Sequence, residues 1–171
     1  RGQSQTKPYQ EAINAWGEVV KHHPRGEFAD AALFQSGIVY INLKRYKQGI
    51  EAFNRVISGY SGSDWHDNAR YQTGRSNYKQ EKYSEAIIAF DGMLRRHPGS
   101  PLVPKAIFGI ANAYFKQGKF TEAIKNYHQI VEKFPDYSKL PDISKLPDAS
   151  KLPDLSKLPD HCKLPGLSKL P

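Results

Sequence analysis

Few side chains in this chain are of the kinds that catalyse reactions or hold metal ions. The 171 residues include six histidines and one cysteine, and imidazole and thiolate groups are frequent general bases, nucleophiles and zinc ligands. A helix-borne metal site needs ligands on one face, for example at i and i+4. Here His22 and His23 are adjacent, and His66, His97 and His128 are scattered. No phosphate-binding glycine loop or nucleophile motif is present. We therefore predict no catalytic residue, no metal site and no cofactor, so that the protein is not an enzyme.

The remaining candidates for chemistry have simpler explanations. His22 and His23 follow Lys21 at the end of a predicted helix, where cationic groups stabilise the negative end of the helix dipole. His161 and Cys162 lie in a proline-rich segment without further ligands nearby. A single cysteine also rules out an intrachain disulfide, so cysteine content does not indicate whether the protein works in an oxidising or a reducing compartment.

The strongest pattern in the sequence is a unit that is clearest between Asp67 and Pro98. From Tyr83 onward, apolar residues follow the i, i+3, i+4, i+7 spacing that places them on one helical face. A stripe of smaller residues precedes them, and the polar run 79–82 separates the two stripes. We therefore predict a helix–turn–helix unit with Gly74 at the point where the helices cross.

This unit recurs every 37 residues. In the second helix the equivalent positions are Tyr9, Tyr46, Tyr83 and Phe120; Ala12, Gly49, Ala86 and Ala123; Ile13, Ile50, Ile87 and Ile124; and Trp16, Phe53, Phe90 and Tyr127. In the first helix they are Phe34, Tyr71 and Phe108, followed by Gly37, Gly74 and Ala111. A period of this length is typical of solenoids. We predict complete helix pairs over residues 29–58, 67–95 and 104–134.

The beginning of the chain supplies only half a repeat. Residues 8–22 match the second helix alone, and Pro8 suits the first turn of a helix. We expect residues 1–7 to be disordered, and the apolar stripe of Ile13, Trp16 and Val20 to be exposed for lack of a first helix. Because Arg1 stands where a start methionine would be, we expect a fragment or a processed product.

The chain changes character after the repeats. Residues 136–171 repeat a six-residue unit in which a variable residue precedes SKLPD or a close variant of it, with a proline in every copy. Regularly spaced prolines remove backbone donors and exclude an α-helix, so we predict a non-helical, low-complexity tail with polyproline II character. The tail is either a flexible spacer or a segment that packs on the last repeat.

The order of small residue, aromatic residue, alanine, large aromatic residue and terminal proline resembles the tetratricopeptide repeat (TPR). The resemblance covers residues 8–135 and implies an all-α, right-handed superhelical solenoid. Three extra residues follow the terminal proline, and this longer unit resembles the bacterial envelope branch of the family. That branch includes Tol-Pal coordinator proteins of the YbgF/CpoB type and BamD-like outer-membrane lipoproteins. The resemblance implies a periplasmic protein-interaction scaffold in cell-envelope assembly or coordination.

In the TPR family the first helices line a concave groove in which extended peptides dock. The family's inward-facing positions correspond here to Asn42, Tyr71, Arg75, Tyr78, Lys79, Lys105, Phe108, Asn112, Phe115 and Lys116. The set contains cations and amides but no acid, and it loosely resembles the carboxylate clamp of chaperone-binding members. The resemblance implies a protein or peptide partner that is acidic or has a free C-terminal carboxylate. The alternative is that these are simply solvated helix residues.

Composition narrows the other possibilities. The net charge is +8, but no basic–aromatic strand or helical reader of nucleic acid is recognisable, so we expect no nucleic-acid partner. No apolar run approaches the length of a membrane span. Two other functions stay open, namely the non-catalytic TPR part of a larger cell-wall enzyme and a cytosolic chaperone-type adaptor. The sequence does not indicate an oligomeric state.

Overall fold

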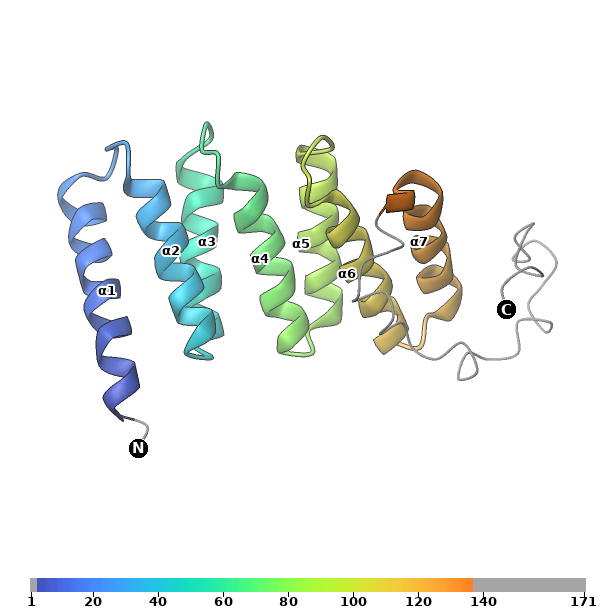
Figure 1. Cartoon of the computed structure of the whole chain (residues 1–171), viewed down its shortest axis with the longest axis horizontal. Helices are drawn as coiled ribbons and strands as arrows, with labels where there is room; N and C mark the ends of the chain where they lie inside the picture. The colour runs from blue at the N-terminus through green and yellow to red at the C-terminus, as the bar shows by residue number, and fades with distance from the viewer. Residues whose placement is uncertain (1–2, 137–171) are drawn as a thin grey trace.

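A computed structural model of the chain describes residues 3–136, with side chains from Lys7 onward. This part consists of α-helices joined by short turns and contains no β-strand. The helices are α1 (Gln3–His22), α2 (Ala29–Asn42), α3 (Tyr46–Gly59), α4 (His66–Lys79), α5 (Tyr83–Arg96), α6 (Val103–Lys116) and α7 (Phe120–Lys133). They stand side by side in chain order, with α1 at one end and α7 at the other (Figure 1), and each contacts the next.

The helix boundaries repeat with the period of the sequence. The first helices α2, α4 and α6 begin at residues 29, 66 and 103, the second helices α3, α5 and α7 begin at 46, 83 and 120, and each of the six is 14 residues long. The predicted all-α architecture of helix pairs is confirmed. Residues 137–171 lie outside the described part, so the predictions about the tail remain predictions.

The first helix is longer than the sequence suggested. Helix α1 begins at Gln3, so the expected disorder over residues 1–7 is wrong for residues 3–7. The segment before Pro8 contains no other helix breaker, and it forms a turn of helix in which Pro8 is an interior residue. Because proline has no N–H, the carbonyl of Ser4 lacks its usual donor, which costs about 3 kcal/mol in a helix interior.

The expected exposure of the α1 apolar stripe is also wrong. Ile13 and Val20 are each only 7% exposed, and Trp16 is half-buried. The reason is that α1, like the other second helices, packs on the first helix of the following repeat, where Val20 joins a core cluster with Leu33. The large apolar residue of α1 that is exposed is Tyr9, at 44%.

Within a repeat, the helix crossing is set by an aromatic ring lying on a small residue. A Cβ atom at Gly37 would lie 2.4 Å from the ring of Phe53, and one at Gly74 would lie 2.6 Å from the ring of Phe90. Real Cβ atoms do not approach neighbours so closely, so a side chain at Gly37 or Gly74 would displace the ring. The third repeat has the buried Ala111 at this position.

The turns between paired helices all place a residue in the left-handed conformation at the same position of the repeat. In the turn after α4, the N–H of Lys82 donates to the carbonyl of Asn77 at 3.0 Å, and the N–H of Glu81 donates to that of Tyr78 at 2.9 Å. This pair of bonds is a Schellman motif, which favours glycine at the left-handed position. The residues at that position are Lys44, Glu81 and Gly118, with φ of 59°, 61° and 74°.

Replacing Gly74 by alanine should lower the free energy of unfolding by about 1–3 kcal/mol, because the added methyl group displaces the Phe90 ring. The measurement is urea denaturation of the whole chain. Gly17, in α1, has no atom near its hypothetical Cβ, so Gly17→Ala is the matched control and should stabilise by about 0.5–1 kcal/mol through helix propensity. Equal effects of the two changes would contradict the described crossing.

Replacing Glu81 by glycine should raise the free energy of unfolding by about 1 kcal/mol, because a side chain in the left-handed region costs roughly 1–2 kcal/mol. The reverse change, Gly118→Ala, should lower it by a similar amount. Thermal or urea unfolding measures both changes. If Glu81→Gly destabilises the chain, contacts of the Glu81 side chain outweigh the strain of its left-handed backbone.

Candidate functional site

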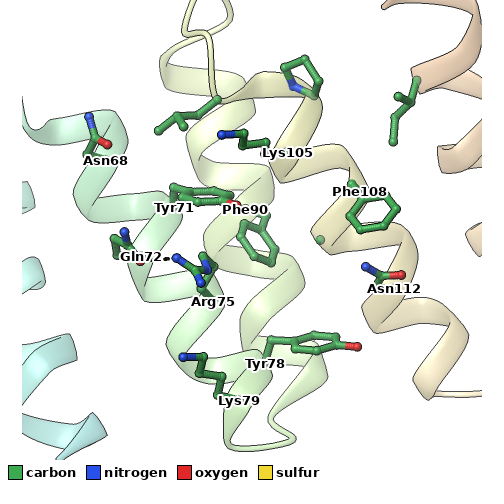
Figure 2. A pocket seen from close by; sticks show the side chains of 14 residues that line it. Asn68, Tyr71, Gln72, Arg75, Tyr78, Lys79, Phe90, Lys105, Phe108 and Asn112 are labelled. Atoms are coloured by element: carbon green, nitrogen blue, oxygen red, sulfur yellow. Dashed lines mark hydrogen bonds between the residues drawn. The ribbon is translucent and has the colours of Figure 1, made fainter. Parts of the chain in front are cut away.

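A cavity of about 660 Å³ lies between α4 and α6 (Figure 2). Helix α4 contributes Asn68, Tyr71, Gln72, Arg75, Tyr78 and Lys79, and α6 contributes Pro104, Lys105, Phe108, Gly109 and Asn112. The buried Phe90 of α5 and Ile130 of α7 line its deeper part, and Leu102 completes it. The volume is in the range of pockets that hold small molecules or several side chains of a peptide.

Helical spacing brings these residues to one face of each helix. On α4, residues 68, 72, 75 and 79 form one row, and 71, 75 and 78 form a neighbouring row. On α6, residues 105, 108, 109 and 112 have the i, i+3, i+4, i+7 spacing. Successive first helices also contact each other directly, both α2 with α4 and α4 with α6. The two rows therefore face a common space.

Most of the residues predicted for the groove do meet there. The cavity between α4 and α6 is lined by Tyr71, Arg75, Tyr78, Lys79, Lys105, Phe108 and Asn112. Asn42 lines a smaller neighbouring cavity of about 120 Å³, which shares Arg75 and Lys79 with the larger one. Lining residues outside the predicted set include Gln72 and Gly109.

Two predicted residues lie elsewhere. The Phe115 ring packs edge-on against Phe120 of α7, with ring centroids 5.4 Å apart, and it lines neither cavity. Lys116 is the last residue of α6 and is exposed. They are the α6 equivalents of Tyr78 and Lys79, which face α6 across the cavity, and within the described residues no further first helix follows α6 to form a second such cavity.

The charge along the cavity is positive and uncompensated. The Arg75 guanidinium lies 5.9 Å from the centroid of the Tyr71 ring, and its Nη1 donates a hydrogen bond to Gln72 Oε1 at 3.3 Å. Lys79 and Lys105 are exposed. No acidic residue lines the cavity, and none of these three cations forms an ion pair within the described residues. The cavity is thus suited to an anionic group.

Aromatic rings form the apolar walls. Tyr71 lies against Phe90 with centroids 5.7 Å apart, and Phe108 lies against Tyr127 at 5.9 Å. Figure 2 shows Tyr78 extending across the lower part of the cavity from α4. Burial, with a smaller contribution from Tyr83, raises the pKa of Tyr78 above its ordinary value, so its hydroxyl stays neutral at physiological pH.

Asn112 is oriented by a buried tyrosine. The hydroxyl of Tyr127 donates to Asn112 Oδ1 at 2.7 Å, and burial raises the pKa of Tyr127 well above its ordinary range, so it remains a donor. Because the amide oxygen is occupied, the amide nitrogen points away from Tyr127. In Figure 2 this nitrogen is on the cavity side, where it is a donor for a ligand oxygen.

The Phe90 ring joins the two walls. A Cβ atom at Gly109 would lie 2.6 Å from this ring, as would one at Gly74, so the ring is held between α4 and α6. The equivalents of Gly109 in the earlier repeats are Gln35 and Gln72. A lone glycine inside a predicted helix, where the other repeats have glutamine, was the available sequence signal for this contact.

The family comparisons agree with this geometry. A family model described as tetratricopeptide repeat matches residues 104–137. The chain contains a tetratricopeptide repeat. A second model, YfiO, described as an outer membrane lipoprotein, matches residues 26–108, so the chain is similar to that family over this stretch. No curated protein sequence matches the chain significantly.

Solved structures show the same fold. The MamA structure comprising residues 41 to the end, from Desulfovibrio magneticus RS-1, matches with a TM-score of 0.61 and 21% identity, over 75% of this chain and 67% of that one. Another crystal structure of MamA matches with a TM-score of 0.63 and 20% identity, over 79% and 74%. The N-terminal domain of stress-induced protein-1 from C. elegans matches with a TM-score of 0.57 and 16% identity, over 68% of this chain and 90% of that one. The predicted TPR fold is confirmed.

Two negative findings complete the description. Among the described helices, none has the length and hydropathy needed to cross a membrane. Within the same residues, no group of three or more histidine, cysteine or carboxylate side chains is arranged to hold a metal ion.

Replacing Tyr127 by phenylalanine should lower the free energy of unfolding by about 1 kcal/mol, because Asn112 Oδ1 loses its donor in a half-buried place. Chemical denaturation measures the change. Tyr114→Phe, on the same pair of helices, is the control and should change the free energy by less than about 0.5 kcal/mol. Equal effects would mean that the Tyr127–Asn112 bond contributes nothing to the site.

Proposed function

We propose that the protein is a non-catalytic scaffold that binds an extended segment of a partner protein in the cavity between α4 and α6. The TPR fold itself supports a role in protein interaction. The observation that carries the finer proposal is the combination of Arg75, Lys79 and Lys105 with aromatic walls and without any acidic lining residue. Such a site fits a segment with a carboxylate next to an apolar side chain.

Each lining side chain has a specific role in holding the bound segment. Arg75 presents a planar donor fork that matches a carboxylate, and Lys79 and Lys105 add point charges at the two ends of the cavity. The Asn112 amide donates to a ligand oxygen, while Tyr71, Tyr78 and Phe108 contact an apolar side chain. A charge-assisted hydrogen bond of this kind contributes about 1.5–3 kcal/mol.

We further propose that the scaffold works in the bacterial cell envelope. Support comes from the match of residues 26–108 to a family described as an outer membrane lipoprotein. A periplasmic location agrees with that description, and the partner would then be a soluble segment of another envelope protein.

The binding proposal is tested with an arrayed set of acidic peptides, each made with a free C-terminal carboxylate and again as the amide. The best-bound peptide is then titrated against variants by fluorescence anisotropy. The double change Lys79→Glu, Lys105→Glu should weaken its binding at least tenfold, since each reversal replaces attraction by repulsion. Raising the salt concentration should weaken the wild-type complex as well.

The matched control reverses two exposed lysines of second helices, Lys47→Glu and Lys125→Glu, which line neither cavity. This control has the same change in net charge and should alter the affinity by less than about twofold. If the two double variants bind the peptide equally, or if no acidic peptide binds, the cavity is not the recognition site.

A further inference from the structure

The middle repeat carries basic residues at three positions that are apolar in both neighbouring repeats. These residues are His66, Arg70 and His97. Their equivalents are Ala29, Leu33 and Tyr60 in the preceding repeat, and Val103, Ile107 and Phe134 in the following one. The equivalents on the first helices are all buried, each 8% exposed or less. A basic cluster therefore replaces part of the apolar core between α4 and α5.

The three side chains fill the seam between these two helices. His66 is the first residue of α4, and His97 is the capping residue at the end of α5. Their rings meet edge to face, with centroids 5.7 Å apart and an interplanar angle of 77°. Arg70 lies one turn after His66, and a Cβ atom at Gly92 of α5 would stand 3.6 Å from its Nη1.

The seam lacks internal acceptors for these groups. In the described part of the chain, His66 Nε2, His97 Nε2 and Arg70 Nε are buried and have no hydrogen-bond partner. Asp67, a carboxylate whose charge acts on His97, already accepts bonds from the backbone N–H of Asn68 and from the Ser100 hydroxyl. A neutral imidazole can pack here as an aromatic ring, whereas a protonated one would be a buried charge with an unpaired donor.

The charges that face His97 oppose its protonation. Arg70 comes from α4 and Arg96 from its own helix, and only Asp67 of α4 has the opposite sign. Burial is the main cause that lowers the pKa of His97 below its ordinary value of 6.5. The negative charge of Asp67 acts against this lowering, whereas His66, Arg70 and Arg96 increase it. The folded state thus binds this proton less tightly than the unfolded state does. The stability that His97 contributes is complete above pH 6.5 and is lost progressively as the pH falls below it.

We propose that the seam formed by His66, Arg70 and His97 is an acid-labile junction, at which protonation loosens α4 from α5 within the second complete repeat. Residues 97–102 lead directly from the seam to Leu102, Pro104 and Lys105 of the cavity. Helix α4 carries the seam on one face and Arg75 on another. Protonation therefore separates the two walls of the cavity and releases a bound segment, a consequence that rests on the function proposed above.

The junction is tested by thermal unfolding of the whole chain at pH 7.5 and pH 5.5. The wild-type midpoint should fall by about 3 °C or more between these values, and His97→Phe, which installs the residue of the third repeat, should abolish most of that fall. The matched control is His23→Phe. His23 is the equivalent residue after α1, in the half repeat that precedes the three complete ones, and it is exposed, so its variant should keep the wild-type pH dependence.

Two outcomes would overturn the proposal. One is an unchanged pH dependence in His97→Phe. The other needs no variant: an NMR titration of the His97 ring in the wild-type chain with a midpoint at or above 6.5 would show that the folded seam accepts the proton freely. Neither measurement involves a peptide, so failure of the proposed binding function leaves both of them decisive. Peptide release at pH 5.5 by wild type but not by His97→Phe would then connect the seam to the cavity.

Discussion

The packing of an aromatic ring onto a residue with almost no side chain is the contact on which this solenoid depends. Phe53 on Gly37 and Phe90 on Gly74 bring the paired helices together at a fixed distance. Phe53 is fully buried and Phe90 is 2% exposed, and burying such a ring contributes about 1.5–3 kcal/mol. No repeat could bury its ring alone, so each must pack on its neighbours to be stable. The rows of cations and aromatic residues on the first helices are placed by this packing.

The sequence predicts the fold well because the fold is periodic. A pattern that returns every 37 residues determines the type, length and pairing of the helices, and most of the groove follows from the helical spacing on α4 and α6. The repeat pattern does not predict a residue's exposure where this depends on which helix packs next to it rather than on its position in the repeat. Ile13 and Val20 were recognisable as apolar, but only the packing of α1 on α2 shows which side they face. Phe115 and Tyr78 hold equivalent positions, and each packs edge-on against the first ring of the next helix. Only Tyr78 lines a cavity, because α4 is followed by another first helix and, within the described residues, α6 is not.

The middle repeat shows a second limit. Single substitutions such as His97 in place of tyrosine or phenylalanine look like ordinary variation along a repeat, and nothing in the sequence reveals that three of them meet. In the structure, the apolar core divides into one cluster around Phe53 and another around Phe90, with polar α4 between them. The most polar first helix therefore stands in the centre of the solenoid, where both the basic seam and the cavity are found.

The position of the Phe90 ring between Gly74 and Gly109 has a kinetic consequence. Because one rigid ring touches both walls, the width of the cavity is already set before any ligand arrives. A segment that enters need not wait for the helices to part, and little conformational entropy is lost by the protein on binding. For the peptide binding proposed above, the encounter rate at neutral pH is then governed by diffusion and by the attraction of the lysines, so complexes form quickly and their lifetimes decide the affinity.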